Sequence, residues 1–163
     1  MDNFWSNAKK KDKVGGIKEL LRNIPLFEQL TDRELTGIQR ILHERRYKAG
    51  EEIFRQGEPG IAMYIIETGG VLIKVGGTDK VLAALHDGEF FGELALLDDS
   101  PRSASAVASA ETKIFAFSQP DLFGVMERNP QLGLKIILAL ARIIGERLKR
   151  MNSQLQTAEN QVA

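Results

Sequence analysis

The sequence predicts an α+β domain, mainly β, in which short strands form a sandwich or barrel between N-terminal helices and a long C-terminal helix. Three observations support this fold class. Short apolar runs separated by turns extend from residue 45 to residue 117, which is typical of a sandwich or barrel. Helix-capping patterns stand on both sides of this region. After residue 130, apolar residues recur with helical spacing.

The chain of 163 residues divides into three predicted parts. These are a flexible basic leader at residues 1–16, a barrel domain with flanking helices at residues 17–129, and a C-terminal helix and tail at residues 130–163. The leader carries a lysine cluster at Lys9, Lys10, Lys11 and Lys13 and is expected to be a solvated tail. Its two aromatic residues, Phe4 and Trp5, support an alternative interpretation as a docking peptide.

Two helices are expected before the barrel. The stretch from Ile17 to Arg22 predicts a short helix, after which Pro25 turns the chain. Thr31 and Glu34 form a capping-box pattern that begins a second helix, running to about Leu42. The apolar face of this helix is expected to be core and consists of Leu35, Ile38, Ile41 and Leu42.

The middle of the chain reads as short strands with turns between them. The expected strands are Arg45–Tyr47, Glu52–Arg55, Ala62–Glu67, Val71–Val75, Val81–Leu85, Ala104–Ala108 and Lys113–Ala116. Turn residues fall between these runs at 49–50, 57–60, 69–70, 76–77 and 87–88. Many short strands at such close spacing predict a sandwich or barrel.

Two helices are expected after the barrel. Ser118 begins the first, with Asp121 as the reciprocal acid of a capping box, and Asn129-Pro130 ends it. The second is expected from about Gln131 to Thr157. It is apolar on two faces at first (Leu132, Ile136, Ala139, Ile143 and, beside them, Ile137, Leu140, Ile144) and then on one stripe (Ile144, Leu148, Met151, Leu155). Because packing on a barrel needs one face, the pattern predicts a second partner, most simply another subunit in a homodimer through residues 137–155.

The stretch from Phe90 to Ser105 combines the features of an anion-binding site. Gly92 and Glu93 open a short helix-prone run to Leu97, and a turn at residues 98–101 folds the chain back. A helix start offers unpaired N–H donors, and the guanidinium of Arg102 is a fork of donors that suits a phosphate. Glu93 is an acceptor that suits a sugar hydroxyl. Donors and acceptor together indicate a phosphate joined to a ribose.

The letters F-G-E-L-A-L at positions 91–96, a short turn, and P-R-S-A at positions 101–104 resemble the phosphate-binding cassette of the cyclic nucleotide-binding domain family. This family includes catabolite activator protein and the regulatory subunits of cyclic-AMP-dependent kinase. The resemblance covers about Leu21 to Leu155 and implies a β-roll (jelly-roll barrel) with N-terminal helices and a C-terminal lid helix. The family's barrel glycines have counterparts at Gly50, Gly57, Gly69, Gly88 and Gly92. Ile61 departs from the family, in which many members carry Asp at this place, and the expected effect is on loop rigidity.

The resemblance also implies roles in the site. Glu93 would accept from the ribose 2′-hydroxyl, while Arg102 and Ser103 would bind the cyclic phosphate. Backbone N–H groups near Gly92, Ala95 and Ala104 would complete the cradle, and Leu94 is also expected among the ligand-binding residues. The simpler structural alternative for Glu93 and Arg102 is an ion pair without a ligand, and the complete cassette pattern favours ligand binding.

The base of the nucleotide would lie against Ile73 and Leu82, covered by the final helix. Arg147 is the nearest candidate on that helix to recognise the base edge, and Arg142 and Lys149 are others. The simpler alternative for Ile73 and Leu82 is ordinary core, and a charged residue on a helix face is usually solvated.

The composition excludes several functional classes. Lys and Arg number 22, as do Asp and Glu, so a general affinity for nucleic acid is not expected. The sequence contains no cysteine, which excludes disulfides, zinc–thiolate sites and iron–sulfur clusters. His43 and His86 stand in no ligand spacing, and no metal site or catalytic motif is expected. Without a signal peptide or an apolar stretch long enough to span a bilayer, the expected location is the cytoplasm.

The sequence therefore predicts a non-enzymatic regulatory module that binds a cyclic nucleotide, cyclic AMP being favoured and cyclic GMP possible. Binding would be transmitted through the C-terminal helix to an unknown effector protein. The alternative is a fragment or relative of a catabolite-activator-type transcription regulator. Because about six residues follow the predicted helix, too few for a helix-turn-helix unit, no direct DNA binding is expected. A third hypothesis is a structural subunit that has kept the fold and lost the ligand.

Overall fold

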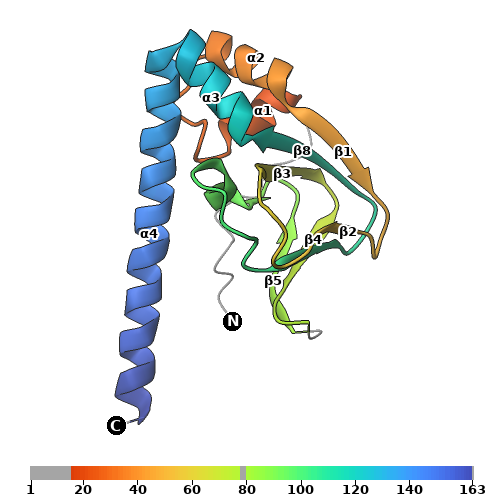
Figure 1. Ribbon diagram of the computed structural model, residues 1–163, viewed down its shortest axis with the longest axis vertical. Coiled ribbons are helices and arrows are strands. Elements are labelled where there is room, and N and C mark those ends of the chain that lie inside the picture. Colours follow the sequence, from red (N-terminus) through yellow and green to blue (C-terminus); the bar gives the residue numbers. More distant parts are fainter. Residues whose placement is uncertain (1–15, 78–79, 163) are drawn as a thin grey trace.

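The computed structural model describes residues 16–77 and 80–162. Figure 1 shows a strand-rich body with short helices at one end and a long helix along its side. In chain order the elements are α1 (Ile17–Arg22), α2 (Asp32–Ile41), β1 (His43–Tyr47), β2 (Glu52–Phe54), β3 (Ala62–Thr68), β4 (Gly70–Lys74), β5 (Val81–His86), β6 (Phe90–Phe91), η1 (Glu93–Leu96), β7 (Ser105–Ala108), β8 (Thr112–Ser118), α3 (Gln119–Arg128) and α4 (Pro130–Val162).

The described strands form two four-stranded antiparallel sheets. The first has the order β1-β8-β3-β6, and the second has the order β2-β7-β4-β5. Each expected strand is present, with ends that differ by one to two residues from the sequence expectation. The two-residue strand β6 was not expected, since its pattern reads only as two apolar residues before a glycine. This arrangement is a β-roll with flanking helices, as the sequence predicts.

Two cores hold the layers together, and β3 contributes to both. Ile65 packs with the helices, whereas its neighbour Ile66 packs between the two sheets, because successive strand residues point to opposite faces. The helix-facing core also takes Leu35 from α2, Leu122 from α3 and Ile136 from α4. The β-roll and its helices are therefore one packed unit.

Local signals set the ends of the helices where the sequence places them. Both capping boxes are formed, Thr31 with Glu34 at the start of α2 and Ser118 with Asp121 at the start of α3. The five glycines matched to the family's barrel positions, Gly50, Gly57, Gly69, Gly88 and Gly92, all have φ between +75° and +106°, a region that glycine adopts without the penalty of a side chain.

Helix α4 is longer than expected and buries both of its predicted apolar faces in its first half. It begins at Pro130, a favoured first helical residue, and runs to Val162 rather than Thr157. Leu140 and Ile143 are buried, and Ile137 and Ile144 are partly buried against the helix-facing core. Part of the second predicted face thus packs on the protein's own core, and the dimer contact through residues 137–155 stays a prediction.

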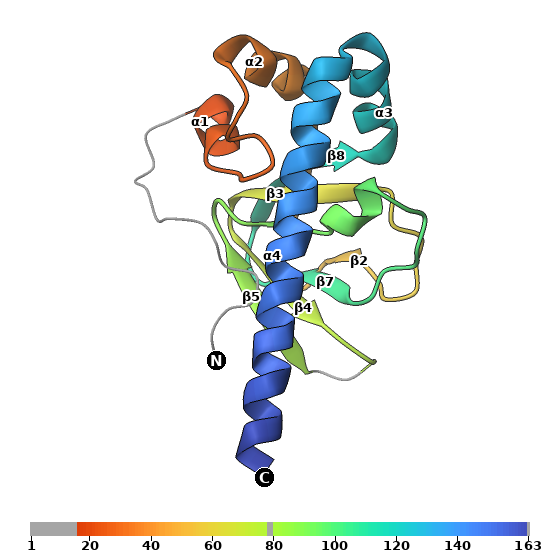
Figure 2. The same cartoon turned by 90° about the vertical axis from the view of Figure 1, so that its left-hand side faces the viewer.

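The apolar residues that stay exposed on α4 are Leu134, Leu138, Leu148, Met151 and Leu155. Figure 2 shows the second half of this helix passing the sheets and extending beyond them. Within the described ranges, none of the helices combines the length and the apolar character needed to cross a membrane.

Candidate functional site

The cassette predicted from the sequence is a loop clamped between the two sheets. It leaves β6, turns at Gly92, makes the single 3₁₀ turn η1 and returns to β7. The turn between β2 and β3 holds the segment of the cassette that returns to β7. The N–H of Arg102 donates to the Glu58 carbonyl and the N–H of Gly57 donates to the Arg102 carbonyl, each at 2.8 Å. A bridge between Pro59 and Pro101 continues this pairing.

This loop encloses a pocket of about 260 Å³, slightly below the usual volume of about 300–1,000 Å³ for small-molecule sites. The pocket gathers most of the predicted site residues. It is lined by Phe54, Gly60, Ile73, Phe91, Gly92, Glu93, Leu94, Ala95, Leu97, Asp98, Ser100, Pro101, Arg102, Ser103 and Ala104. Among the predicted site residues, Leu82 and Arg147 are outside this lining.

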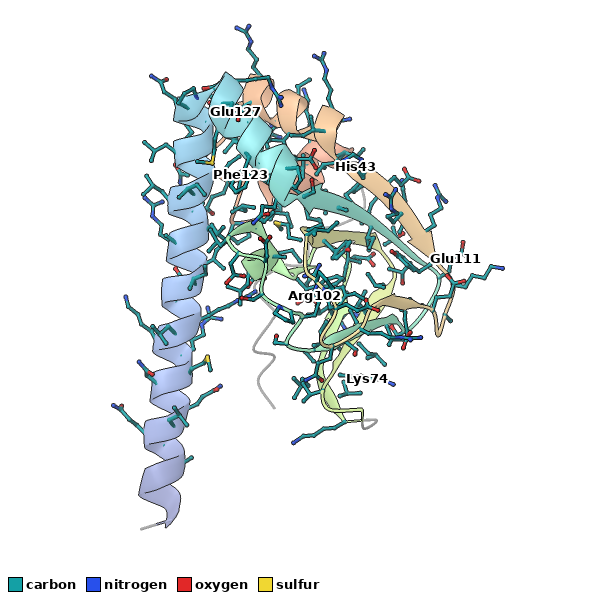
Figure 3. The ribbon with its side chains drawn as sticks, in the orientation of Figure 1. His43, Lys74, Arg102, Glu111, Phe123 and Glu127 are labelled. Atoms are coloured by element: carbon teal, nitrogen blue, oxygen red, sulfur yellow. The ribbon has the colours of Figure 1, made fainter. Side chains whose placement is uncertain are left out.

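Arg102 is buried and held by backbone carbonyls. Its side chain lies within the strand-rich part of the molecule (Figure 3), and the residue is 8% exposed. Nη2 donates to the Ala62 carbonyl at 2.7 Å, and Nη1 to the Gly92 carbonyl at 3.4 Å. Nε is buried without a hydrogen-bond partner. Burial lowers the pKa of Arg102, while Tyr64 and Glu58 act in the opposite direction.

Glu93 is also buried, and it pairs with α4 rather than with Arg102. Its Oε1 accepts from Nη1 of Arg147, and the exposed fractions of the two side chains are 3% and 16%. Oε2 of Glu93 is buried and has no hydrogen-bond partner. Burial, with Arg150 adding repulsion, lowers the pKa of Arg147 to about 10, so its guanidinium is still charged at neutral pH. The pocket lining therefore contains a buried cation, Arg102, and a buried anion, Glu93, and each of them has one polar atom without a hydrogen-bond partner.

Other predicted residues take more limited positions. Leu94 and Ser103 are exposed at the pocket, and Ala104 is half-buried. The N–H of Ala95 donates to the Gly92 carbonyl at 3.2 Å, so it is already used by η1. The predicted helix-prone run to Leu97 is thus a 3₁₀ turn ending at Leu96, too short to offer an α-helical N-terminus.

Ile73 and Leu82 differ in burial and in their relation to the pocket. Ile73 pairs with Ala83 across β4 and β5, and cross-strand partners point to the same face. Ile73 is buried at the pocket, whereas Leu82 is 47% exposed. The structure brings Ile73 to the pocket, whereas Leu82 lies outside the pocket lining, at the register shift between the Ile73–Ala83 and Lys74–Val81 pairs.

Sequence reasoning missed two residues beside Arg102. The Arg102 Cζ lies 4.1 Å from the ring centroid of Phe54 and 5.6 Å from that of Tyr64. These rings come from β2 and β3, far from the cassette in sequence, and the apolar pattern marks them only as strand residues. The described residues contain no group of three or more His, Cys, Asp or Glu side chains that could hold a metal ion.

Comparison with known proteins finds one family. The sequence profile of the cyclic nucleotide-binding domain matches residues 44–129, which includes the whole cassette. The chain is 36% identical over 129 residues to the cyclic AMP receptor protein of Thermus thermophilus, a match that covers 77% of this chain and 60% of that protein. It is 37% identical over 97 residues to the cAMP-dependent protein kinase regulatory subunit of Colletotrichum orbiculare, covering 60% of this chain and 25% of that protein.

A similar solved structure is the N-terminal domain of a transcriptional regulator from Streptomyces coelicolor. The TM-score is 0.70 at 30% identity, and the match covers 83% of this chain and 93% of that domain. The chain thus spans less than two thirds of the two curated relatives and nearly the whole of this separate domain.

Proposed function

The chain belongs to the cyclic nucleotide-binding domain family, and from this premise we propose that it is a regulatory module that binds a cyclic mononucleotide, with cyclic AMP favoured over cyclic GMP. The observation that carries the proposal is the pocket in which buried Arg102 and buried Glu93 each keep one unpartnered polar atom. Buried polar atoms without partners are rare in folded proteins. A cyclic nucleotide supplies an anion for the cation and a hydroxyl donor for the carboxylate.

In the proposed complex, Arg102 and Ser103 bind the cyclic phosphate, and backbone groups of Gly92, Leu94, Ala95 and Ala104 surround it. The N–H of Ala95 becomes available only if η1 rearranges, since it is bonded to Gly92. The base lies against Ile73. Leu82 takes part only if the β4–β5 hairpin moves, because Leu82 now lies outside the pocket lining.

Glu93 connects the proposed ligand to α4. Oε1 is engaged by Arg147, and Oε2 is available to the ribose 2′-hydroxyl. A ribose on Oε2 fixes the carboxylate and with it the Arg147 contact, so that ligand binding favours one position of α4. A ligand shifts such an equilibrium only by binding one arrangement better than another. Arg147 would also lie near the base edge, and the exposed Arg142 and Lys149 are the other candidates on α4.

The proposed output runs through α4 to another protein. Leu148, Met151 and Leu155 remain exposed on its second half, and we assign to residues 137–155 a homodimer contact and to the dimer an unidentified effector protein. In this proposal the domain acts by binding rather than by catalysis, needs no metal and does not contact DNA itself.

A second candidate function is supported by the Streptomyces coelicolor match, namely the sensor domain of a transcription regulator. A gel-shift assay at low salt, with and without cyclic AMP, separates the two candidates. A shift that depends on the nucleotide would favour the second.

Titration calorimetry of ligand-free protein with cyclic AMP, cyclic GMP and a cyclic dinucleotide tests the proposed function. We expect saturable binding of a cyclic mononucleotide and a rise in melting temperature in the same samples. Protein from which bound ligand has been removed, checked by chromatography of a denatured sample, is the required starting material. Absence of both heat and thermal shift with every nucleotide would overturn the proposal.

A matched pair of glycine variants tests the geometry of the cassette. A Cβ on Gly92 would lie 2.7 Å from Nη1 of Arg102, whereas a Cβ on Gly50 has no atom within 4 Å, although both residues have positive φ. Gly92→Ala and Gly50→Ala should each lower the free energy of unfolding by about 1–2 kcal/mol. Only Gly92→Ala should also weaken cyclic AMP binding, by about tenfold or more, because it displaces the guanidinium. Equal affinities of the two variants in calorimetry would contradict this role.

A further inference from the structure

The guanidinium of Arg102 rests on an aromatic surface rather than against a carboxylate. Its Cζ is 4.1 Å from the ring centroid of Phe54 and 5.6 Å from that of Tyr64. The hydrogen bonds of its Nη atoms go to backbone carbonyls. The nearby carboxylate of Glu58 accepts from the N–H of Arg55 at 3.0 Å. Ile61, the residue directly before β3, is apolar and exposed, so it provides no carboxylate for Arg102.

The aromatic surface is itself packed as a unit. Tyr64 stacks on Phe54 at 5.8 Å and on Phe91 at 5.3 Å between ring centroids, with interplanar angles of 27° and 28°. Phe54 and Phe91 are 5.9 Å apart. The three rings come from β2, β3 and β6 and so join strands of both sheets. A surface built from three strands is a stiff support for a side chain as long as arginine.

The backbone restrains the guanidinium further. A Cβ on Gly60 would lie 3.1 Å from Nε of Arg102, which is tighter than ordinary contact. The guanidinium is therefore restrained by the Gly60 backbone, by the carbonyls that accept from its Nη atoms and by the aromatic rings of Phe54 and Tyr64. The Nε–H group is buried and has no partner, so the side chain is oriented and still has a donor to offer.

We propose that Phe54 and Tyr64 are positioning residues for the phosphate, an aromatic platform that holds the Arg102 guanidinium in place without neutralising it. The ring faces attract a cation through their quadrupole, whereas a carboxylate partner would cancel the charge that the ligand needs. The proposal rests on the proposed function for the identity of the anion. It goes beyond it in assigning the orientation of Arg102 to residues outside the cassette.

The platform can be tested without any ligand. In proton–nitrogen NMR spectra of the ligand-free protein, the ring currents of Phe54 and Tyr64 should shift the Arg102 Nε–H resonance away from that of an exposed arginine. Arg102→Lys identifies the signal by removing it. Phe54→Leu should return it toward the exposed value, and Phe54→Tyr should keep it displaced. The matched control is Phe123→Leu, since Phe123 is an exposed residue of α3 and lies apart from Arg102 (Figure 3).

Binding measurements then test what the platform does. Phe54→Leu and Tyr64→Leu should each weaken cyclic AMP binding by between about 2-fold and 30-fold, and Phe54→Tyr should restore most of the affinity. Tyr64 is not among the residues that line the pocket, so its effect is expected to reach the ligand through Arg102. Adenosine, which lacks the phosphate, should bind the wild type and both leucine variants equally in competition experiments.

Each result has a distinct meaning. An Arg102 Nε–H signal that Phe54→Leu does not move, in protein that remains folded, would overturn the platform. So would equal losses of adenosine and cyclic AMP affinity, which would make Phe54 a simple pocket wall. If the wild type binds no cyclic nucleotide, the proposed function fails, and the NMR comparison still decides whether the platform exists.

Discussion

Replacing Arg102 by alanine is expected to weaken cyclic AMP binding by about 2–5 kcal/mol, the usual effect of removing one partner from a buried hydrogen-bonded charge pair. The residue is 8% exposed and lines the pocket, so the phosphate of the proposed ligand would meet it largely out of water. Water replaces little of the lost interaction in such a site. Calorimetric titration of the variant and the wild type measures the difference.

Two further variants make the Arg102 result specific. Arg102→Lys keeps the charge and loses the planar fork of donors, so its affinity should lie between those of the wild type and the alanine variant. Arg46→Ala removes an arginine whose side chain is 68% exposed and should leave the affinity unchanged. Wild-type affinity in Arg102→Ala would show that the phosphate does not bind in this pocket.

Replacing Glu93 by alanine should lower the free energy of unfolding by about 3–5 kcal/mol, because it leaves the Arg147 guanidinium buried without its partner. The structure places this pair at the contact between η1 and α4, with both side chains largely buried. Urea unfolding followed by circular dichroism gives the stability of each variant. The same substitution removes the proposed ribose acceptor, so it should weaken nucleotide binding as well.

A double-mutant cycle separates the ion pair from other effects. Glu93→Gln combined with Arg147→Met should be less destabilising than the sum of the two single changes, because the double variant leaves no buried charge unpaired. Glu19→Ala is the matched control. It breaks a pair with Arg22 in which both side chains are 41% exposed, and its stability should stay close to that of the wild type. Additive effects at Glu93 and Arg147 would contradict an energetic link between η1 and α4.

The parts of the fold that depend on neighbouring residues could be predicted from the sequence. The Thr31–Glu34 and Ser118–Asp121 boxes are local patterns, and both form as expected. The cassette is a contiguous pattern, and most of its predicted residues, Arg102 among them, line one pocket.

The parts that depend on three-dimensional packing could not. The Glu93–Arg147 pair joins residues 54 positions apart and depends on the path of α4 past η1. Ile73 and Leu82 look alike in the sequence, and only the β4–β5 register shows that Ala83 is the residue opposite Ile73. The rings beside Arg102 come from β2 and β3, and only the closure of the β-roll brings them to the cassette.

Because α4 is long, a small displacement of this helix beside Glu93 would be larger at its far end. The helix has 33 residues, which makes it about 50 Å long, and Arg147 lies near its midpoint. A tilt of about 5° about its first turn would displace the far end by about 4 Å, at a rise of about 1.5 Å per residue. The same tilt moves the level of Arg147 by about 2 Å. A shift of α4 at the pocket would thus be about doubled where the helix extends beyond the body (Figure 2).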